Sequence, residues 1–283
     1  MSLIDTANER PILTQFTDPM CTWCWGSEPI IRRLRTVLGD QFQIRYVMGG
    51  LVEDFDEFHD AANNISEPSD VAPHWEEASA IHGMPVNIEI FETDPAHSTY
   101  PASKAFTAAR RQETDLAHRY LRRLREAYMT QVRNVNHREI QVELAKSVGL
   151  DVDEFTAALD SGKAQAAFED DLERTRDAGV RAFPTYHIEG PAGEQWTSGF
   201  TSFDELIATV TAVDPSVEPS SPPPMRQFIA DYEPVATREI AEVYELQAGK
   251  ARQVLESLAD DGTVRRESRG NGFFWHSTTG GVN

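Results

Sequence analysis

The stretch DPMCTWCWG, residues 18–26, decides the fold, and it holds both cysteines of this 283-residue chain, Cys21 and Cys24. Residues 11–17, PILTQFT, are a short apolar run typical of a β-strand that ends at a turn-forming Asp-Pro pair. Residues 25–38 then carry apolar side chains at helical spacing. Residues 42–48 alternate as in a second strand. The pattern predicts a strand–helix–strand unit with the cysteines where the first strand meets the helix.

The position of the two cysteines indicates redox chemistry. The N-terminus of a helix favours a thiolate, so we expect Cys21 to be the attacking thiol. Cys24 lies one turn later on the same face, where it can resolve a mixed disulfide. Half of a zinc site is the alternative, but the sequence has no second cysteine pair and no His-X(3–5)-His pair. We therefore expect neither a metal nor a cofactor.

The rest of the chain divides into segments of different character. Residues 53–179 carry helical signals, and a strand entered through Pro184 follows, with residues 195–200 as its hairpin partner and residues 203–210 as a closing helix. Residues 213–224 are rich in proline and serine, which is typical of a stiff linker. The last segment predicts two helices and a hairpin with an Asn-Gly turn, similar to a winged helix-turn-helix. We expect domains at 1–212 and 225–283.

The charge balance is unusual. The chain has 46 acidic and 26 basic residues, a net charge of −20, and its only lysines are Lys104, Lys146, Lys163 and Lys250. An acidic, arginine-rich surface of this kind is typical of salt-adapted proteins, and we expect a halophilic, haloarchaeal protein. Binding to nucleic acid is disfavoured because it needs a basic face. No run of about 20 apolar residues and no signal-peptide pattern is present, so we expect a cytoplasmic protein without a membrane span.

Five segments together resemble the DsbA-like thioredoxin-fold family, in particular its FrnE-type branch. They are residues 18–26, the MGGL of residues 48–51, the STYPASKAF of 98–106, the EAYMTQVRNV of 126–135 and the GVRAFPTYHIEG of 179–190. The resemblance implies an α/β thioredoxin fold with a large helical insertion at about residues 53–179. It also implies protein-disulfide oxidoreductase activity at Cys21 and Cys24, faced by a cis Pro184. Substrate-binding residues near the active surface would be Asp18, Trp23, Trp25, Tyr100 and Phe183.

The chain departs from that family at two places. Gln15 stands where many thioredoxin-fold enzymes have a buried acid; Asp18 could replace that acid or simply cap the cysteine helix. The residues between the cysteines are Thr22 and Trp23, so no imidazolium lies beside Cys21. We therefore expect a Cys21 pKa below the ordinary value of about 8.5 but no extreme acidity. Most histidines are interpreted as surface residues, with His97 as a candidate for the substrate groove.

The sequence favours a thiol–disulfide oxidoreductase that acts on protein or low-molecular-weight thiols and disulfides. One alternative is a glutathione-dependent isomerase or transferase of the kappa and hydroxychromene-carboxylate type, although those proteins usually have serine at the first cysteine position. Another is a redox-sensing adaptor or regulator that uses the winged-helix-like tail. Arg265, Arg266 and Arg269 on the expected wing leave duplex binding open, but we favour a tail that packs on the body or mediates a homodimer.

Overall fold

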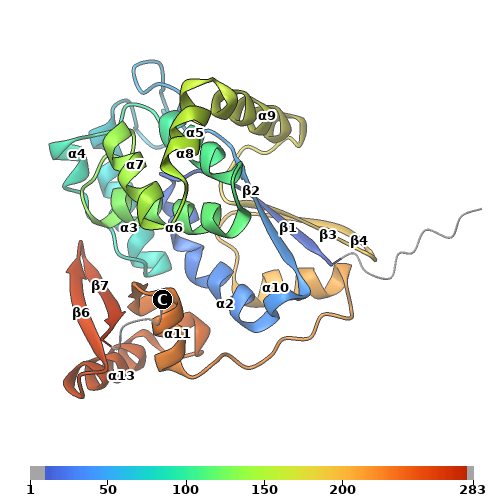
Figure 1. Ribbon diagram of the computed structural model, residues 1–283, viewed down its shortest axis with the longest axis vertical. Helices are drawn as coiled ribbons and strands as arrows, with labels where there is room; N and C mark the ends of the chain where they lie inside the picture. The colour runs from blue at the N-terminus through green and yellow to red at the C-terminus, as the bar shows by residue number, and fades with distance from the viewer. Residues whose placement is uncertain (1–9, 279–283) are drawn as a thin grey trace, which may run out of the picture.

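The computed structural model describes residues 10–278; residues 1–9 and 279–283, which we expected in the first and last domains, lie outside the described residues. A four-stranded sheet with the order β2-β1-β3-β4 forms the centre (Figure 1). The strands β1 and β2 are parallel, and the other neighbours are antiparallel. The strands are β1 (Ile12–Thr17), β2 (Gln43–Met48), β3 (Thr185–Gly190) and β4 (Gly193–Ser198).

The predicted strand–helix–strand unit is confirmed. A parallel pair of strands needs a crossover connection, and the chain between β1 and β2 supplies it with α1 (Thr22–Gly26), α2 (Glu28–Leu38) and the short η1 (Gly39–Gln41). A fold-closing helix, α10 (Phe203–Val213), packs against both α2 and β3. The α/β thioredoxin-like architecture expected from the sequence is therefore the one observed.

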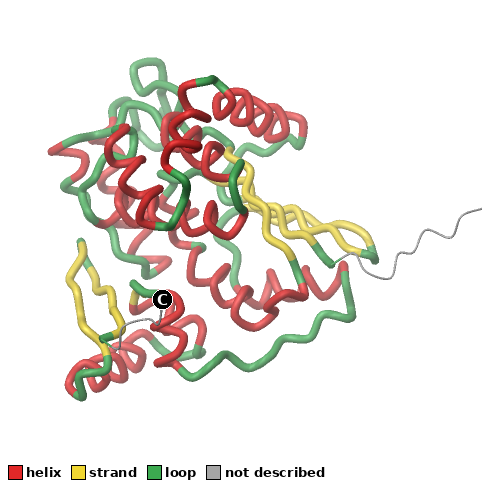
Figure 2. Tube along the Cα trace, viewed as in Figure 1, coloured by secondary structure: helices red, strands yellow, loops and turns green. Residues whose placement is uncertain are grey.

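The helical insertion lies between β2 and β3, and Figure 2 shows it as a group of helices beside the sheet. Its longest helix, α6, supplies a face of buried side chains, and α9 packs against β2. Asp151 caps α8 as predicted, since its carboxylate accepts a hydrogen bond from the Glu154 backbone N–H. None of the helices within residues 10–278 is long and apolar enough to cross a bilayer. The insertion comprises η2 (Pro68–Val71), α3 (Ala72–His82), α4 (Ile90–Thr93), α5 (Tyr100–Arg110), α6 (Thr114–Thr130), α7 (Arg138–Ser147), α8 (Val152–Asp160) and α9 (Lys163–Asp177).

Residues 225–278, here called the C-terminal unit, have a separate small core around Phe228 and Trp275. The two expected helices and the hairpin are present, whereas the helix that opens the unit and the short strand after it were not predicted. A three-stranded sheet has the order β5-β7-β6. The elements are α11 (Met225–Tyr232), β5 (Val235–Ala236), α12 (Thr237–Val243), α13 (Ala248–Asp260), β6 (Val264–Arg269) and β7 (Gly272–Ser277).

The tip of the β6–β7 hairpin is docked on the insertion. The Asn271 backbone N–H donates to the Val86 carbonyl at 3.0 Å, and the Val86 N–H donates to the Asn271 side chain at 2.9 Å. Gly270 has a φ of +53° and lies so close that an added Cβ would fall 2.1 Å from the Val86 carbonyl oxygen. Arg269 on the same hairpin pairs with Glu126 of α6. The hairpin tip therefore contacts the body rather than projecting into solvent.

Candidate active site

The cysteine pair begins helix α1, as the sequence predicts. Cys21 is the residue before the helix, and its carbonyl accepts the Trp25 backbone N–H at 3.0 Å. The Cys21 side chain is 5% exposed and Cys24 is fully buried. The Cys21 thiol faces the Phe183 carbonyl oxygen at 3.7 Å, and the Phe183–Pro184 peptide bond is cis. The structure thus brings together the three residues expected to carry the chemistry.

Two consecutive glycines explain how Phe183 and Tyr100 approach this site. A Cβ on Gly49 would fall 2.0 Å from the Phe183 ring, and a Cβ on Gly50 would fall 2.8 Å from the Tyr100 ring. Both aromatic side chains are half-buried. Leu51, the next residue, is 41% exposed and was not identified from the sequence. The MGGL segment therefore lets two aromatic rings close in beside an exposed leucine.

The buried cysteine lies beside a positive charge that the sequence did not reveal. Arg125 of α6 is fully buried, and its guanidinium donates to the Thr17 hydroxyl at 2.5 Å. Thr17, at the end of β1, in turn hydrogen-bonds to Cys24. A charged donor and a hydroxyl thus form a relay toward the Cys24 sulfur.

The electrostatics of the pair differ from the sequence-based expectation. The hydrogen bond with Cys24 and burial raise the pKa of Cys21 well above its ordinary value. Burial also raises the pKa of Cys24, but the hydrogen bond from Cys21, the charge of Arg125 and the Thr17 hydroxyl outweigh it, and the pKa falls. These opposite shifts favour ionisation of Cys24 before Cys21 in the reduced pair. These directions are opposite to the expected acidic Cys21 and protonated Cys24, because the hydrogen bond between the two thiols raises the pKa of Cys21 and, with Arg125 and Thr17, lowers that of Cys24.

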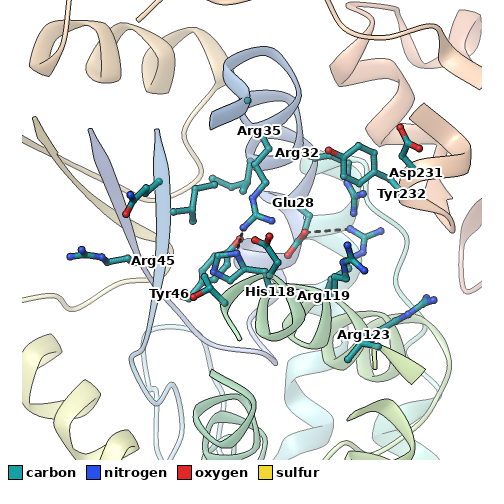
Figure 3. A pocket seen from close by; sticks show the side chains of 18 of the residues that line it. Glu28, Arg32, Arg35, Arg45, Tyr46, His118, Arg119, Arg123, Asp231 and Tyr232 are labelled. Carbon is teal, nitrogen blue, oxygen red and sulfur yellow. Dashed lines mark hydrogen bonds and ion pairs between the residues drawn. The ribbon is translucent and has the colours of Figure 1, made fainter. Parts of the chain in front are cut away.

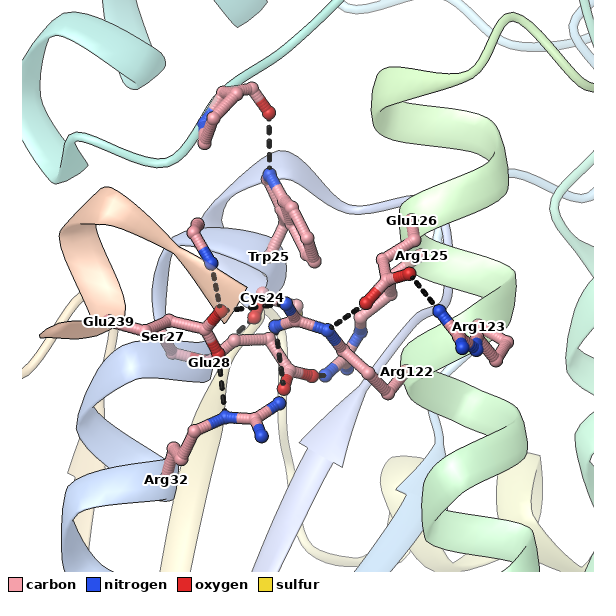
Figure 4. A network of polar contacts seen from close by, with 12 residues as sticks. Cys24, Trp25, Ser27, Glu28, Arg32, Arg122, Arg123, Arg125, Glu126 and Glu239 are labelled. Atoms are coloured by element: carbon pink, nitrogen blue, oxygen red, sulfur yellow. Dashed lines mark hydrogen bonds and ion pairs between the residues drawn. The ribbon is translucent and has the colours of Figure 1, made fainter. Parts of the chain in front are cut away.

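Arg125 belongs to a buried ionic network that joins the two parts of the molecule (Figure 4). Glu28 of α2 pairs with Arg125 and with Arg122, and the surrounding charges lower the pKa of Glu28 to about 2 against the opposing effect of burial. Arg122 also pairs with Glu239 of the C-terminal unit at 2.8 Å. Glu239, fully buried, pairs with Arg32 of α2 at 2.6 Å. The cysteine pair is thus connected to α12 through Thr17, Arg125 and a short chain of ion pairs.

Asp18 is buried, and its carboxylate is hydrogen-bonded to other residues of the protein. The carboxylate is fully buried and accepts hydrogen bonds from the backbone N–H groups of Met20 and Leu51 and from the Thr99 hydroxyl. Burial raises its pKa despite these donors. Its predicted role in substrate binding is wrong, because all its partners are internal. It does not cap α1 with its side chain either.

The two tryptophans beside the cysteines have different surroundings. Trp25 is fully buried, and its indole N–H donates to the Pro85 carbonyl at 2.8 Å, so it is a core residue and its predicted substrate-binding role is wrong. Trp23 is half-buried, and its ring lies 5.9 Å from the His82 ring and 6.0 Å from the Phe200 ring. Of the two, only Trp23 can reach a substrate.

His82 lies at the site, and its interpretation as a surface residue was wrong. Its ring is buried, and Nδ1 accepts the Met84 backbone N–H at 3.0 Å, so the proton is on Nε2, which lies 3.4 Å from the Thr22 hydroxyl between the cysteines. Burial and the nearby Arg238 lower its pKa to about 4. No spacing in the sequence could have shown this contact. His97, the candidate for the substrate groove, is exposed and pairs with Asp56.

The zinc alternative receives no further ligands. In the part of the chain that the structure describes, the only cluster with metal-ligating geometry is formed by His187, Glu189 and Glu194, and it contains neither cysteine. These three residues lie on the β3–β4 hairpin, where His187 stacks on Trp196. The described residues therefore do not add the cysteine pair to a cluster of three possible metal ligands.

These features define a thioredoxin-fold protein with a two-cysteine site, and sequence comparison agrees. The family model described as thioredoxin matches residues 15–200, more than half of the chain, so the chain belongs to this thioredoxin family. A curated relative, the ClpXP adapter protein SpxH of Halalkalibacterium halodurans, is 29% identical over 264 residues, which are 92% of this chain and 86% of the relative.

Solved structures show the same fold. A structure from Nitrosomonas europaea has a TM-score of 0.62 at 21% identity and covers 71% of this chain and 96% of its own. The cytosolic disulfide reductase DsbM from Pseudomonas aeruginosa has a TM-score of 0.53 at 22% identity and covers 72% of this chain and 94% of its own. At these identities the likeness concerns the fold.

Proposed function

We propose that this protein carries out cytoplasmic thiol–disulfide exchange on protein or low-molecular-weight thiols, as a member of the DsbA-like group. The observation that carries the proposal is the Cys21 thiol at 3.7 Å from the Phe183 carbonyl, at the start of a helix and in front of Pro184. Of the two cysteines, Cys21 is the one that retains some exposed surface, whereas Cys24 is fully buried. The absence of any further cysteine fits a reducing compartment, where structural disulfides are rare.

The exchange proceeds in two displacements. Cys21 attacks one sulfur of a substrate disulfide, its proton passing to the Cys24 thiolate, and the second substrate sulfur leaves as a thiolate that takes up a proton from solvent. The Cys24 thiolate, once its proton has passed to solvent, attacks the Cys21 sulfur of the mixed disulfide; the bond between Cys21 and the substrate sulfur breaks, and the substrate leaves as a thiolate that is protonated by solvent, which leaves a Cys21–Cys24 disulfide. Arg125 and Thr17 favour the thiolate needed for this second step. The same steps in reverse oxidise a dithiol.

The surface beside Cys21 suits an extended polypeptide. Phe183, whose carbonyl faces the Cys21 thiol, and Trp23, which lies between the cysteines, are half-buried, and the neighbouring MGGL segment adds the half-buried Tyr100 and the exposed Leu51. An apolar surface of this kind binds substrate side chains and leaves the exchange chemistry to the thiols.

Trapping of mixed disulfides tests the proposal. The Cys24→Ser variant keeps the attacking thiol and lacks the resolving one, so it should accumulate mixed disulfides that are visible on non-reducing gels. The Cys21→Ser variant should trap almost nothing, because its remaining thiol is fully buried. The double variant is the control for background. Equal trapping by the two single variants, or trapping by Cys21→Ser alone, contradicts the assigned roles.

A second candidate function is that of a protease adaptor in which the cysteine pair acts as a redox sensor. The observation that favours it is the extent of similarity: the SpxH relative matches 92% of this chain, whereas the DsbM structure covers 72%. We propose that the C-terminal unit is winged-helix-like and provides the docking surface. Purified ClpXP of the relative's organism should then bind the protein. The variant without cysteines should bind ClpXP equally well under oxidising and under reducing conditions. If neither the wild type nor this variant binds ClpXP, the role is contradicted.

A further inference from the structure

A cavity of about 1000 Å³ lies between α2, β2, α6 and the end of α11, and Glu28 is one of the residues that line it (Figure 3). Its volume is that of a site for a small molecule. The lining is rich in arginine although the whole chain has a net charge of −20. The lining arginines are Arg10, Arg32, Arg35, Arg45, Arg119, Arg122 and Arg123.

Three of these arginines have no acidic partner. Arg35, Arg45 and Arg119 form no ion pair with any residue of the described range 10–278, whereas the other four each pair with a carboxylate. The lining carboxylates Glu28 and Glu126 are already engaged by buried arginines. The remaining acids are exposed or half-buried: Asp40, Asp115, Asp231 and Glu233. The wall formed by α2, β2 and α6 thus has an excess of positive charge.

His118 adds an uncharged donor to the same wall. A guanidinium nitrogen of Arg35 lies 2.7 Å from His118 Nδ1, and since arginine can only donate, Nδ1 accepts and the proton is on Nε2. Burial and the charge of Arg35 lower the pKa of His118 to about 3, so the ring is neutral at pH 7. No residue in the described part of the chain accepts a hydrogen bond from Nε2. Figure 3 shows Arg35 beside His118 on the wall of the cavity, which Arg119 also lines.

We propose that this cavity binds a small multivalent oxyanion, bearing phosphate or carboxylate groups, between Arg35 and Arg119. The guanidinium group is planar and matches the two oxygens of a phosphate or carboxylate. The Nε2–H of His118 provides a further hydrogen bond. A long polyanion such as nucleic acid is disfavoured, because the acidic exterior repels it.

Calorimetric titration of the intact protein with inorganic pyrophosphate and, separately, with citrate tests the site. We expect one anion per chain, with an affinity that falls about tenfold or more in Arg35→Gln and in Arg119→Gln, since each loses a charge-assisted hydrogen bond. Arg111→Gln is the matched control: Arg111 is exposed, forms no ion pair with a described residue and does not line the cavity. Its affinity should stay within about twofold.

The position at which the anion binds can be measured separately by NMR. The ¹⁵N resonance of His118 Nε2 should shift on addition of the anion in the wild type and not in Arg35→Gln, whose fold is checked by circular dichroism. Binding of pyrophosphate, of citrate or of both supports the proposal and identifies the oxyanion. Absence of binding for both anions overturns it, as does an equal loss of affinity in Arg111→Gln. Binding of an oligoglutamate peptide in place of both small anions also overturns it.

Discussion

Glu239 is the fully buried residue of the C-terminal unit that pairs with arginines of the thioredoxin-fold body, and its replacement tests the contribution of the buried ionic network. The carboxylate is fully buried, forms an ion pair with Arg32 at 2.6 Å, and accepts hydrogen bonds from Arg122 at 2.8 Å and from the Ala236 backbone N–H at 2.7 Å. Glu239→Gln keeps the shape but removes the charge, so Arg32 is left buried without an ionic partner. Breaking a buried pair costs about 3–5 kcal/mol, and because glutamine can still accept one bond we expect a loss of about 2–4 kcal/mol.

Equilibrium unfolding in urea at fixed KCl, followed by tryptophan fluorescence, measures this loss. The corresponding fall in melting temperature is roughly 5–15 °C at about 2–4 °C per kcal/mol. Glu256→Gln is the control, because Glu256 lies in the same unit but pairs with Arg252 at an exposed position. It should cost at most about 0.5 kcal/mol. If the two variants lose the same stability, the network is not what holds the C-terminal unit in place.

The remaining predictions concern the acidic surface, His82 and Gly49. The melting temperature should be higher in molar KCl than in dilute buffer, because salt screens the repulsion within a chain of net charge −20; a flat or inverted dependence contradicts the salt-adapted interpretation. The pKa of His82 is about 4 in the folded state against 6.5 unfolded, so the unfolded state binds more protons below pH 6.5 and stability is lost as the pH falls. Between pH 7 and pH 5 the wild type should lose about 2 kcal/mol more unfolding free energy than His82→Gln, as measured by urea midpoints. An equal pH dependence of the two proteins would contradict the assigned pKa of His82. Gly49→Ala should displace the Phe183 ring and slow disulfide exchange, at a cost of about 1–3 kcal/mol, whereas Gly249→Ala, with open space around it, should leave the exchange rate unchanged.

The part of the fold around the cysteines could be predicted because the spacing of apolar residues changes there between a strand pattern and a helix pattern. The apolar run of β1, the alternation in β2 and the helical spacing in α2 are local signals, and the Asn-Gly turn marks the β6–β7 hairpin in the same way. The position of Pro184 in front of Cys21 came from the resemblance, since a lone proline carries no such information.

The surroundings of Cys24 could not be predicted, because they are made by residues far apart in the chain. Arg125 and Thr17 are 108 positions apart and meet only when α6 packs beside the end of β1. Charged residues are usually exposed, so Arg122, Arg125 and Glu239 would be assigned to the surface from the sequence. Their burial depends on α2, α6 and α12 supplying opposite charges to one another. The place of His82 at the site could not be predicted for the same reason, because it contacts Thr22, which is 60 positions away in the sequence.

The segment between α10 and α11 has a thermodynamic consequence for the whole molecule. Residues 214–224 contain no helix or strand, yet Ser220 donates its backbone N–H to the Val37 carbonyl at 2.7 Å and the Glu218 carbonyl accepts from Gln41 at 2.9 Å. A tether held along α2 keeps the C-terminal unit at a high effective concentration next to its docking surface, of millimolar order for short linkers. The interface between the C-terminal unit and the rest of the protein is therefore fully occupied within one chain, even if it would be weak between separate fragments. Cleavage of this tether would make the same contact reversible and dependent on protein concentration.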